Sequence, residues 1–161
     1  VTVTRTMASP ESAEGPEAGP PAAFAPYRWF PARCLEVVDA DTLRVDLDLG
    51  LRIYRTETIR LAGLNAPERA TPDGRRATEY VVAWLRERDA LPGQDGVRAD
   101  AWPLVVGTLR PDKYGRVSGA VWAAKDRACL NQDLVRVGLA AVWEGRGPKP
   151  GPKLELSGGS E

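Results

Sequence analysis

Residues 37–50 read VVDADTLRVDLDLG, and this stretch decides the fold that the sequence predicts. From Leu43 to Leu49 every second residue is apolar, and the residues between them are charged. Such strict alternation is typical of a β-strand with one face in the protein core and the other in water. Asp39 and Asp41 come just before this strand, so the stretch predicts an acidic turn that joins two strands.

The neighbouring segments extend this strand into a small sheet that is followed by a helix. We expect one strand over 34–38, before the acidic turn, and a third strand over 53–64. Three strands joined in this way form a β-meander. Between residues 77 and 85 the apolar residues follow helical spacing, which predicts an amphipathic helix of about four turns.

Two further strands and a second helix complete the predicted order of elements. Strands over 104–109 and 117–122 flank a tight hairpin in which Gly115 supplies a positive φ. Asn131 is the expected N-cap of a short last helix that Gly138 ends. Five strands with a helix between the third and the fourth predict a mainly β fold with α, an OB-fold five-stranded barrel with two or three helices.

Length and composition suggest one domain with a tail at each end. The chain has 161 residues, and we expect an OB-fold domain over 27–144. Residues 1–26 are rich in Ser, Glu, Gly, Pro and Ala and are expected to be disordered, and residues 145–161 are expected to be a flexible tail. No apolar run approaches the ~18 residues of a membrane span, and no signal peptide is visible. We therefore expect a cytoplasmic protein without a membrane partner.

The sequence contains no histidine, which restricts the chemistry that is available. Ser-His-Asp and Cys-His nucleophilic catalysis, histidine general bases and imidazole-bound metals are excluded. Cys34 and Cys129 are too few for a four-thiolate zinc site, and they form either one disulfide or two free thiols. Lysine and arginine balance aspartate and glutamate at 22 each. Any reaction must therefore use carboxylates, hydroxyls, tyrosine, arginine, lysine or a hard metal ion.

Three residues in the first half of the chain are candidates for such chemistry. Asp41 in the acidic turn could coordinate a hard cation, or it could bond to local backbone groups. Arg60 lies in the apolar run of residues 59–64, where it needs a phosphate or carboxylate partner or forms a structural ion pair. Glu68 follows a rigid proline turn and could serve as a general base or cap the backbone after it.

The hairpin of residues 112–116, DKYGR, is the fourth candidate. It places the cations Lys113 and Arg116 around a tight turn together with the ring of Tyr114. Such a group can bind a phosphate or can simply be a solvated hairpin tip.

Several segments resemble, in family order, the staphylococcal-nuclease-like (thermonuclease) family. They are VVDADTLRV, TIRLAGLNAPE, the helix with Gly74 and Ala77, RPDKYGRVSGAVW and LNQDLVRVGLAAV, which together cover roughly residues 33–143. The resemblance implies an OB barrel with appended helices. It also implies an endonuclease that hydrolyses phosphodiester bonds of DNA or RNA with the help of calcium, and whose partner is single-stranded or denatured nucleic acid.

The resemblance further implies a binding site for one calcium ion. Asp41 matches the calcium carboxylate, and the backbone carbonyl of Ala66 matches a further ligand. Asn65 departs from the pattern, because the founding member of the family has a second calcium-binding aspartate there. An amide oxygen can still coordinate, but the site has one negative charge fewer, so we expect weak calcium binding.

The remaining roles concern the substrate. By resemblance, Arg60 and Arg116 contact the phosphate, and Glu68 activates the attacking water. Lys113 and Tyr114 match the pair near the terminal phosphate of the bound nucleotide. The nucleotide-stacking tyrosine of the founding member has no counterpart, and stacking on the neighbouring Trp143 is a hypothesis.

A second hypothesis is a module that does not cut. An OB surface can bind single strands or a protein partner without catalysis, and Asn65 and the near-zero charge of the core domain favour this alternative. In either case we expect a monomer.

Overall fold

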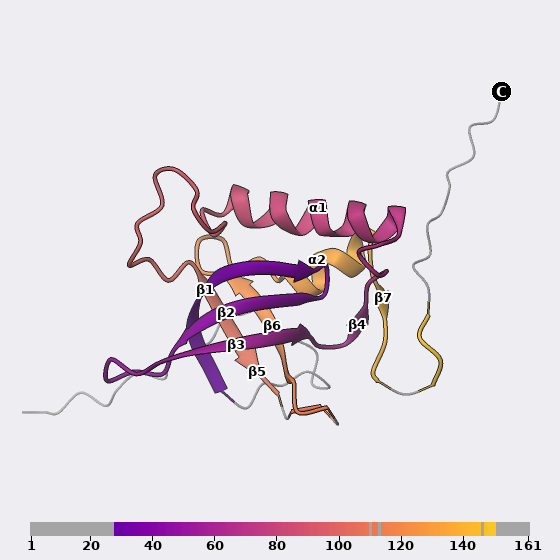
Figure 1. Ribbon diagram of the computed structural model, residues 1–161, viewed down its shortest axis with the longest axis horizontal. Helices are drawn as coiled ribbons and strands as arrows, with labels where there is room; N and C mark the ends of the chain where they lie inside the picture. Colours follow the sequence, from indigo (N-terminus) through magenta and orange to yellow (C-terminus); the bar gives the residue numbers. More distant parts are fainter. Residues whose placement is uncertain (1–27, 110, 113, 146, 151–161) are drawn as a thin grey trace, which may run out of the picture.

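Five strands close into a barrel in the computed structural model, which describes residues 28–109, 111–112, 114–145 and 147–150. Around the barrel the order is β1-β2-β3-β6-β5, and every pair is antiparallel except β3 with β6, which is parallel. Figure 1 shows the arrangement. The five strands are β1 (Arg28–Asp39), β2 (Thr42–Asp48), β3 (Tyr54–Leu61), β5 (Leu104–Thr108) and β6 (Val117–Ala123). The predicted five-stranded OB-type barrel is confirmed.

The acidic turn connects β1 with β2. In β2 the predicted alternation holds, since Leu43, Val45 and Leu47 are buried and point into the barrel core. β1 is longer than the segment expected from the sequence, and its pairing with β2 shifts register twice, the second time between Val37 and Asp39. Irregularities of this kind bend a strand and re-aim the residues at its end. The bend leads directly into the turn.

The segment expected as one strand over 53–64 is divided in two. β3 ends at Leu61, and the chain turns at Gly63, whose φ is 77°. β4 (Leu64–Asn65) then pairs with β7 (Ala141–Val142) in a separate two-stranded sheet that the sequence did not predict. A positive φ is easily adopted only by glycine, so the break in the strand falls at that residue.

Helix α1 (Pro72–Glu87) lies across one side of the barrel. The Thr71 side chain caps it by accepting a hydrogen bond from the backbone N–H of Gly74, and proline occupies the first turn. Proline suits this position because its missing N–H has no partner there anyway. The helix buries an apolar stripe that includes Ala77, Val81 and Leu85, as its periodicity predicted.

Helix α2 (Leu130–Arg136) begins differently from the prediction. The N-cap is Cys129, and Asn131 lies inside the helix with its side chain buried, so its assignment as N-cap is wrong. The Asn131 amide oxygen accepts from the Val121 N–H at 3.0 Å, and its amide nitrogen donates to the carbonyls of Ala62 and Gly119. Asparagine is used here because its two-sided amide satisfies backbone groups of both β6 and the turn after β3.

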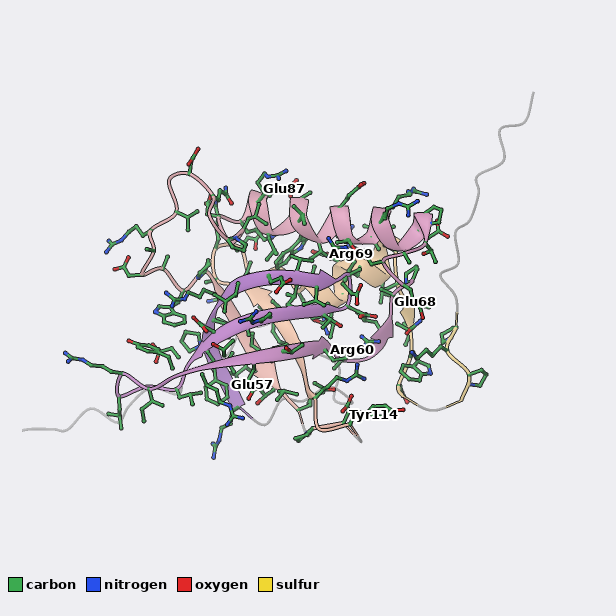
Figure 2. The ribbon with its side chains drawn as sticks, in the orientation of Figure 1. Glu57, Arg60, Glu68, Arg69, Glu87 and Tyr114 are labelled. Carbon is green, nitrogen blue, oxygen red and sulfur yellow. The ribbon has the colours of Figure 1, made fainter. Side chains whose placement is uncertain are left out.

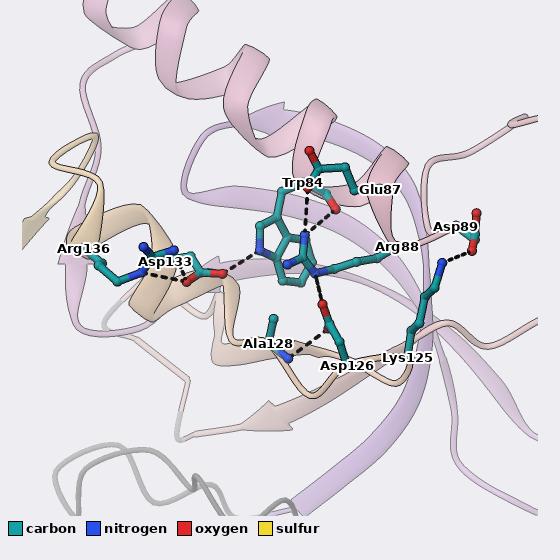
Figure 3. Close-up of polar contacts among 9 residues, drawn as sticks. All are labelled: Trp84, Glu87, Arg88, Asp89, Lys125, Asp126, Ala128, Asp133 and Arg136. Atoms are coloured by element: carbon teal, nitrogen blue, oxygen red, sulfur yellow. Dashed lines mark hydrogen bonds and ion pairs between the residues drawn. The ribbon is translucent and has the colours of Figure 1, made fainter.

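A polar network joins the end of α1 to α2 and to the loop after β6 (Figure 3). The Trp84 indole donates to the Asp133 carboxylate at 2.8 Å. The Arg88 guanidinium lies 4.3 Å from the Trp84 ring centroid and forms an ion pair with Asp126 at 3.0 Å. The Trp84–Asp133 hydrogen bond fixes the two helices relative to each other, and Arg88 connects the end of α1 to the loop after β6.

Cys34 and Cys129 are free and buried, and burial raises the pKa of the Cys34 thiol to about 11. Neither helix in the described residues has the length and apolar character needed to cross a membrane.

Replacing Asn131 with leucine tests its role as a link. We expect the free energy of unfolding to fall by about 2–4 kcal/mol, because the Val121 N–H and the Ala62 carbonyl lose their partner. Urea denaturation followed by tryptophan fluorescence measures the change. The matched control is Gln132→Ala, on the next, exposed position of α2, which should change stability by less than about 0.5 kcal/mol. Equal stability of the leucine variant and the wild type would contradict the assignment.

Candidate active site

A cavity of about 310 Å³ opens at the end of the barrel where the acidic turn lies. It is formed by the acidic turn, the end of β3, the loop from β4 to α1, the residue before β6 and the chain after β7. The predicted site residues that line it are Asp41, Arg60, Asn65, Ala66, Glu68 and Arg116. Predicted site residues as far apart in the sequence as Asp41 and Arg116 are thus brought to one cavity.

The two remaining predicted site residues are Tyr114 and Lys113 of the DKYGR segment. Tyr114 is 71% exposed on the hairpin before β6 and is not among the lining residues. Figure 2 nevertheless shows it at the same end of the barrel as Arg60 and Glu68. Lys113 lies outside the described residues, so its role stays a prediction.

The Asp41 carboxylate makes three polar contacts at the cavity. One oxygen accepts from the Thr42 hydroxyl at 3.0 Å, and the other accepts from the backbone N–H of Ala66 at 3.0 Å. The second oxygen also forms an ion pair with the Arg60 guanidinium at 3.0 Å. Since a carboxylate offers about four lone-pair positions, these three contacts still leave one position for another ligand.

Arg60 is a buried cation that is held on several sides. Its guanidinium donates to the carbonyls of Leu61 and Leu64 at 3.1 and 3.2 Å, and its side chain is 12% exposed, as is that of Asp41. Burial lowers the pKa of Arg60 and the Asp41 carboxylate opposes the shift, but a guanidinium remains charged at neutral pH. The ion pair that the sequence left open is therefore present, and the same guanidinium also lines the cavity.

The loop that carries Glu68 is clamped from the side of α1. The Glu68 carbonyl accepts from both the backbone N–H and the hydroxyl of Thr71, at 2.9 and 2.7 Å. Gly74 packs so closely that a Cβ atom there would lie 1.9 Å from the Glu68 carbonyl oxygen. The cap of the helix is Thr71, so the capping role left open for Glu68 is not used, and the Glu68 residue is exposed at the cavity.

Arg69 connects the same loop to β1. Its guanidinium donates to the carbonyl of Val38 at 2.9 Å, at the end of β1 and next to the acidic turn. The loop with Glu68 is thereby connected to both α1 and β1. Sequence reasoning missed this contact because the acceptor is a backbone carbonyl 31 residues away.

Asp112 positions Arg116 and was also missed. One oxygen of its carboxylate accepts from the backbone N–H groups of Tyr114 and Arg116, at 2.9 Å each. The other oxygen accepts from the Arg116 guanidinium at 2.8 Å. An aspartate that bonds to the backbone two residues later is a known turn signal, and the DKYGR spacing could have indicated it. Arg116 remains 47% exposed, with its guanidinium 5.4 Å from the Tyr114 ring centroid.

The chain after β7 also reaches the cavity. Lys149 and Pro150 line it, and the Asn65 amide nitrogen donates to the Pro150 carbonyl at 3.4 Å. The Lys149 ammonium lies 5.9 Å from the Trp143 ring centroid. These residues belong to the segment expected as a flexible tail; the division into domain and tails itself stays a prediction, as does base stacking on Trp143.

The oxygen atoms at the cavity suit a hard cation. The Asp41 carboxylate, the Asn65 amide oxygen and the Ala66 carbonyl are the kinds of ligand that calcium prefers. Within the described ranges, no group of three or more Asp, Glu, Cys or His side chains is arranged to hold a metal ion. Three carboxylates, from Asp39, Asp41 and Glu68, face three cations, from Arg60, Arg116 and Lys149. The donor types fit a cation, but the balanced charge favours weak binding.

The comparison with known families finds one match. A family model described as staphylococcal nuclease homologue matches residues 58–157. The matched region contains every lining residue named above except Asp39, Asp41 and Thr42 of the acidic turn, which lie before it. The comparison with curated proteins finds no match.

Replacing Gly74 with alanine tests the clamp on the Glu68 loop. In an exposed helix interior this change stabilises a protein by up to about 1 kcal/mol. Here we expect a loss of about 1–3 kcal/mol, because the methyl group displaces the Glu68 carbonyl. Urea denaturation measures stability, and amide chemical shifts of residues 68–71 report the displacement. Arg76→Ala, on an exposed position of the same helix, is the control. Stabilisation by Gly74→Ala would contradict the contact.

The titration of Asp112 tests its hold on Arg116. Partial desolvation raises the pKa of Asp112, but the Arg116 N–H, the Arg116 guanidinium and the Tyr114 N–H together lower it below its ordinary value of 3.8. Because the folded-state pKa is the lower one, the interaction stabilises the fold above pH 3.8 and is lost as the pH falls through the folded-state pKa. NMR titration of the side-chain carboxyl should give a midpoint below 3.8 that rises in Arg116→Met. A wild-type midpoint at or above 3.8 would contradict this assignment.

Proposed function

Because the chain belongs to the staphylococcal nuclease homologue family, whose members are generally nucleases, we propose that it is a metal-dependent endonuclease. Its substrate is single-stranded or denatured DNA, with RNA as a second substrate. The observation that carries this proposal is the cavity in which two arginines, one exposed glutamate and a set of oxygen ligands meet.

The two arginines bind the phosphate of the scissile bond. Hydrolysis adds negative charge to the phosphoryl group in the transition state, and guanidinium groups placed beforehand stabilise that charge without reorganisation. Arg60 is oriented by Asp41 and by backbone carbonyls, and Arg116 is oriented by Asp112. Arg60 thus forms the buried floor, while the more exposed Arg116 approaches the phosphate from the hairpin side. Lys113 and Tyr114 are proposed to lie near the terminal phosphate of the bound nucleotide.

Glu68 acts on the water that attacks the phosphorus. Its side chain orients the water and takes its proton as the new P–O bond forms. The bond to the 5′ oxygen breaks and that oxygen takes up a proton from water, so the products are a 3′-phosphate and a 5′-hydroxyl. Two clamps support the loop that carries Glu68, from α1 through Thr71 and from β1 through Arg69, which limits the positions that its carboxylate can adopt.

Calcium is the metal that we propose for the cavity. Asp41, the Asn65 amide oxygen and the Ala66 carbonyl would hold it, and when bound it would supply positive charge that polarises the phosphoryl oxygen. Asn65 contributes no negative charge, so affinity for the ion is expected to be low.

The second candidate is a nucleic-acid-binding module that does not cut. Two of the proposed calcium ligands are already engaged, which favours this candidate. The Asn65 amide donates to the Pro150 carbonyl, and the Asp41 carboxylate is paired with Arg60. Such a module would bind single strands at the cavity, with calcium playing no part. Cleavage assays separate the two candidates directly.

The cleavage experiment compares wild type and Glu68→Gln on heat-denatured DNA, with millimolar calcium or excess chelator. Release of acid-soluble nucleotides is expected only from the wild type with calcium. The glutamine variant should be slower by about 10²–10⁴-fold, the usual contribution of a general base, and should retain DNA binding. Absence of cleavage by the wild type at every calcium concentration, with binding retained, would favour the second candidate. Calcium-dependent cleavage that is equal in the two proteins would refute the role of Glu68.

A substitution at Asn65 tests the metal site separately. Asn65→Asp restores a negative charge beside Asp41, so calcium should bind more tightly, as measured by calcium titration with intrinsic fluorescence. Cleavage by this variant should reach half its maximum at a lower calcium concentration. Unchanged calcium dependence would show that residue 65 is not a ligand.

A further inference from the structure

In the segment of residues 147–150, Gly-Pro-Lys-Pro, Lys149 and Pro150 line the cavity, and the Pro150 carbonyl contacts Asn65 of β4. In Figure 1 the chain after β7 lies on the same side of the barrel as these two short strands. Proline restricts its own φ and also restricts the residue before it to extended conformations. Lys149, between Pro148 and Pro150, therefore belongs to a stiff segment with little conformational entropy to lose.

Lys149 differs from the two arginines of the cavity in its charge partners. Arg60 is paired with Asp41, and Arg116 is paired with Asp112. For Lys149 no carboxylate lies at ion-pair distance among the residues that the structure describes, and its ammonium lies 5.9 Å from the Trp143 ring centroid. Contact with an aromatic face leaves the remaining N–H donors of an ammonium available to an anion.

We propose that Lys149 is a substrate-binding residue whose ammonium contacts a backbone phosphate of the bound single strand, beside the scissile one. This inference rests on the proposed function, since it takes the cavity as the place where the strand binds. Asn65 is the positioning residue, because its amide nitrogen holds the Pro150 carbonyl and with it the segment.

This arrangement also gives a physical reason for the asparagine at position 65. An aspartate has no N–H to donate, and its carboxylate would repel the carbonyl oxygen of Pro150. Asparagine removes one negative charge from the cavity and holds a segment that adds one positive charge. Both effects favour the polyanionic strand and disfavour a calcium ion.

Binding as a function of salt concentration tests the proposal without cleavage. The Glu68→Gln protein, in chelator, is titrated into a fluorescently labelled oligothymidylate while anisotropy is recorded at several salt concentrations. Removal of one phosphate contact on a single strand should reduce the slope of log affinity against log salt by about 0.7. Lys149→Ala in this background is expected to show that reduction and weaker binding, and Lys149→Arg should restore both.

Two further variants separate a charge contact from a general effect on the fold. Lys125 forms an exposed ion pair with Asp89 and does not line the cavity, so Lys125→Ala is the matched control and should leave the slope unchanged. Asn65→Ala should reduce the slope as Lys149→Ala does. The double variant should then add little to either, because both changes remove the same contact.

The outcomes distinguish this proposal from the proposed function. A Lys149→Ala protein with the affinity and slope of its parent overturns the Lys149 proposal, even if the wild type cuts DNA. Tighter binding or faster cleavage on loss of Lys149 also overturns it, and would show instead that the segment obstructs the cavity. A wild type that never cuts, together with Lys149-dependent binding, would refute the nuclease and support the Lys149 contact.

Discussion

The buried carboxylate of Asp41 is the group on which the rest of the site depends. A charge removed from water must be paired and hydrogen-bonded, because an unpartnered one would cost several kcal/mol. Asp41 meets this requirement with Thr42, the Ala66 N–H and Arg60. These partners come from β2, the loop after β4, and β3, so one carboxylate joins three segments. The three residues that compensate for the burial of the Asp41 charge, Thr42, Arg60 and Ala66, also line the cavity.

Further contacts connect the segments around Asp41 to the two helices and to β1. Asn131 ties α2 and β6 to the turn after β3, which sets the direction in which the chain enters β4. Gly74 lets the start of α1 pack directly against the Glu68 backbone, and Arg69 draws the same loop toward β1. The barrel core is apolar, and the hydrogen bonds and ion pairs that connect its segments lie at the ends of the strands. The cavity therefore lies where the sheet stops and short, well-anchored loops begin.

The electrostatics of the cavity follow from the same contacts. Its carboxylates and its cations are equal in number, and each arginine is paired with an aspartate that orients it. Such pairing stabilises a guanidinium in one geometry and lowers its rotational freedom. A phosphate that enters would add negative charge among fixed donors, where the surrounding protein does not have to reorganise.

The sequence by itself determined the five barrel strands and their order along the chain, because alternation and helical spacing report whether each residue's own side chain is buried. The family followed separately, from the resemblance of several motifs in family order. The sequence also restricted the chemistry, since a chain without histidine must work with carboxylates and cations. It did not reveal that Asn131 binds backbone groups of β6, that the strand after Arg60 breaks at Gly63, or that Lys149 reaches the cavity. Only the tertiary structure decided these, because the partners are backbone groups or side chains distant in sequence, such as Asn65 and Pro150, which are 85 residues apart. Local patterns carry no information about which distant backbone group will meet a side chain.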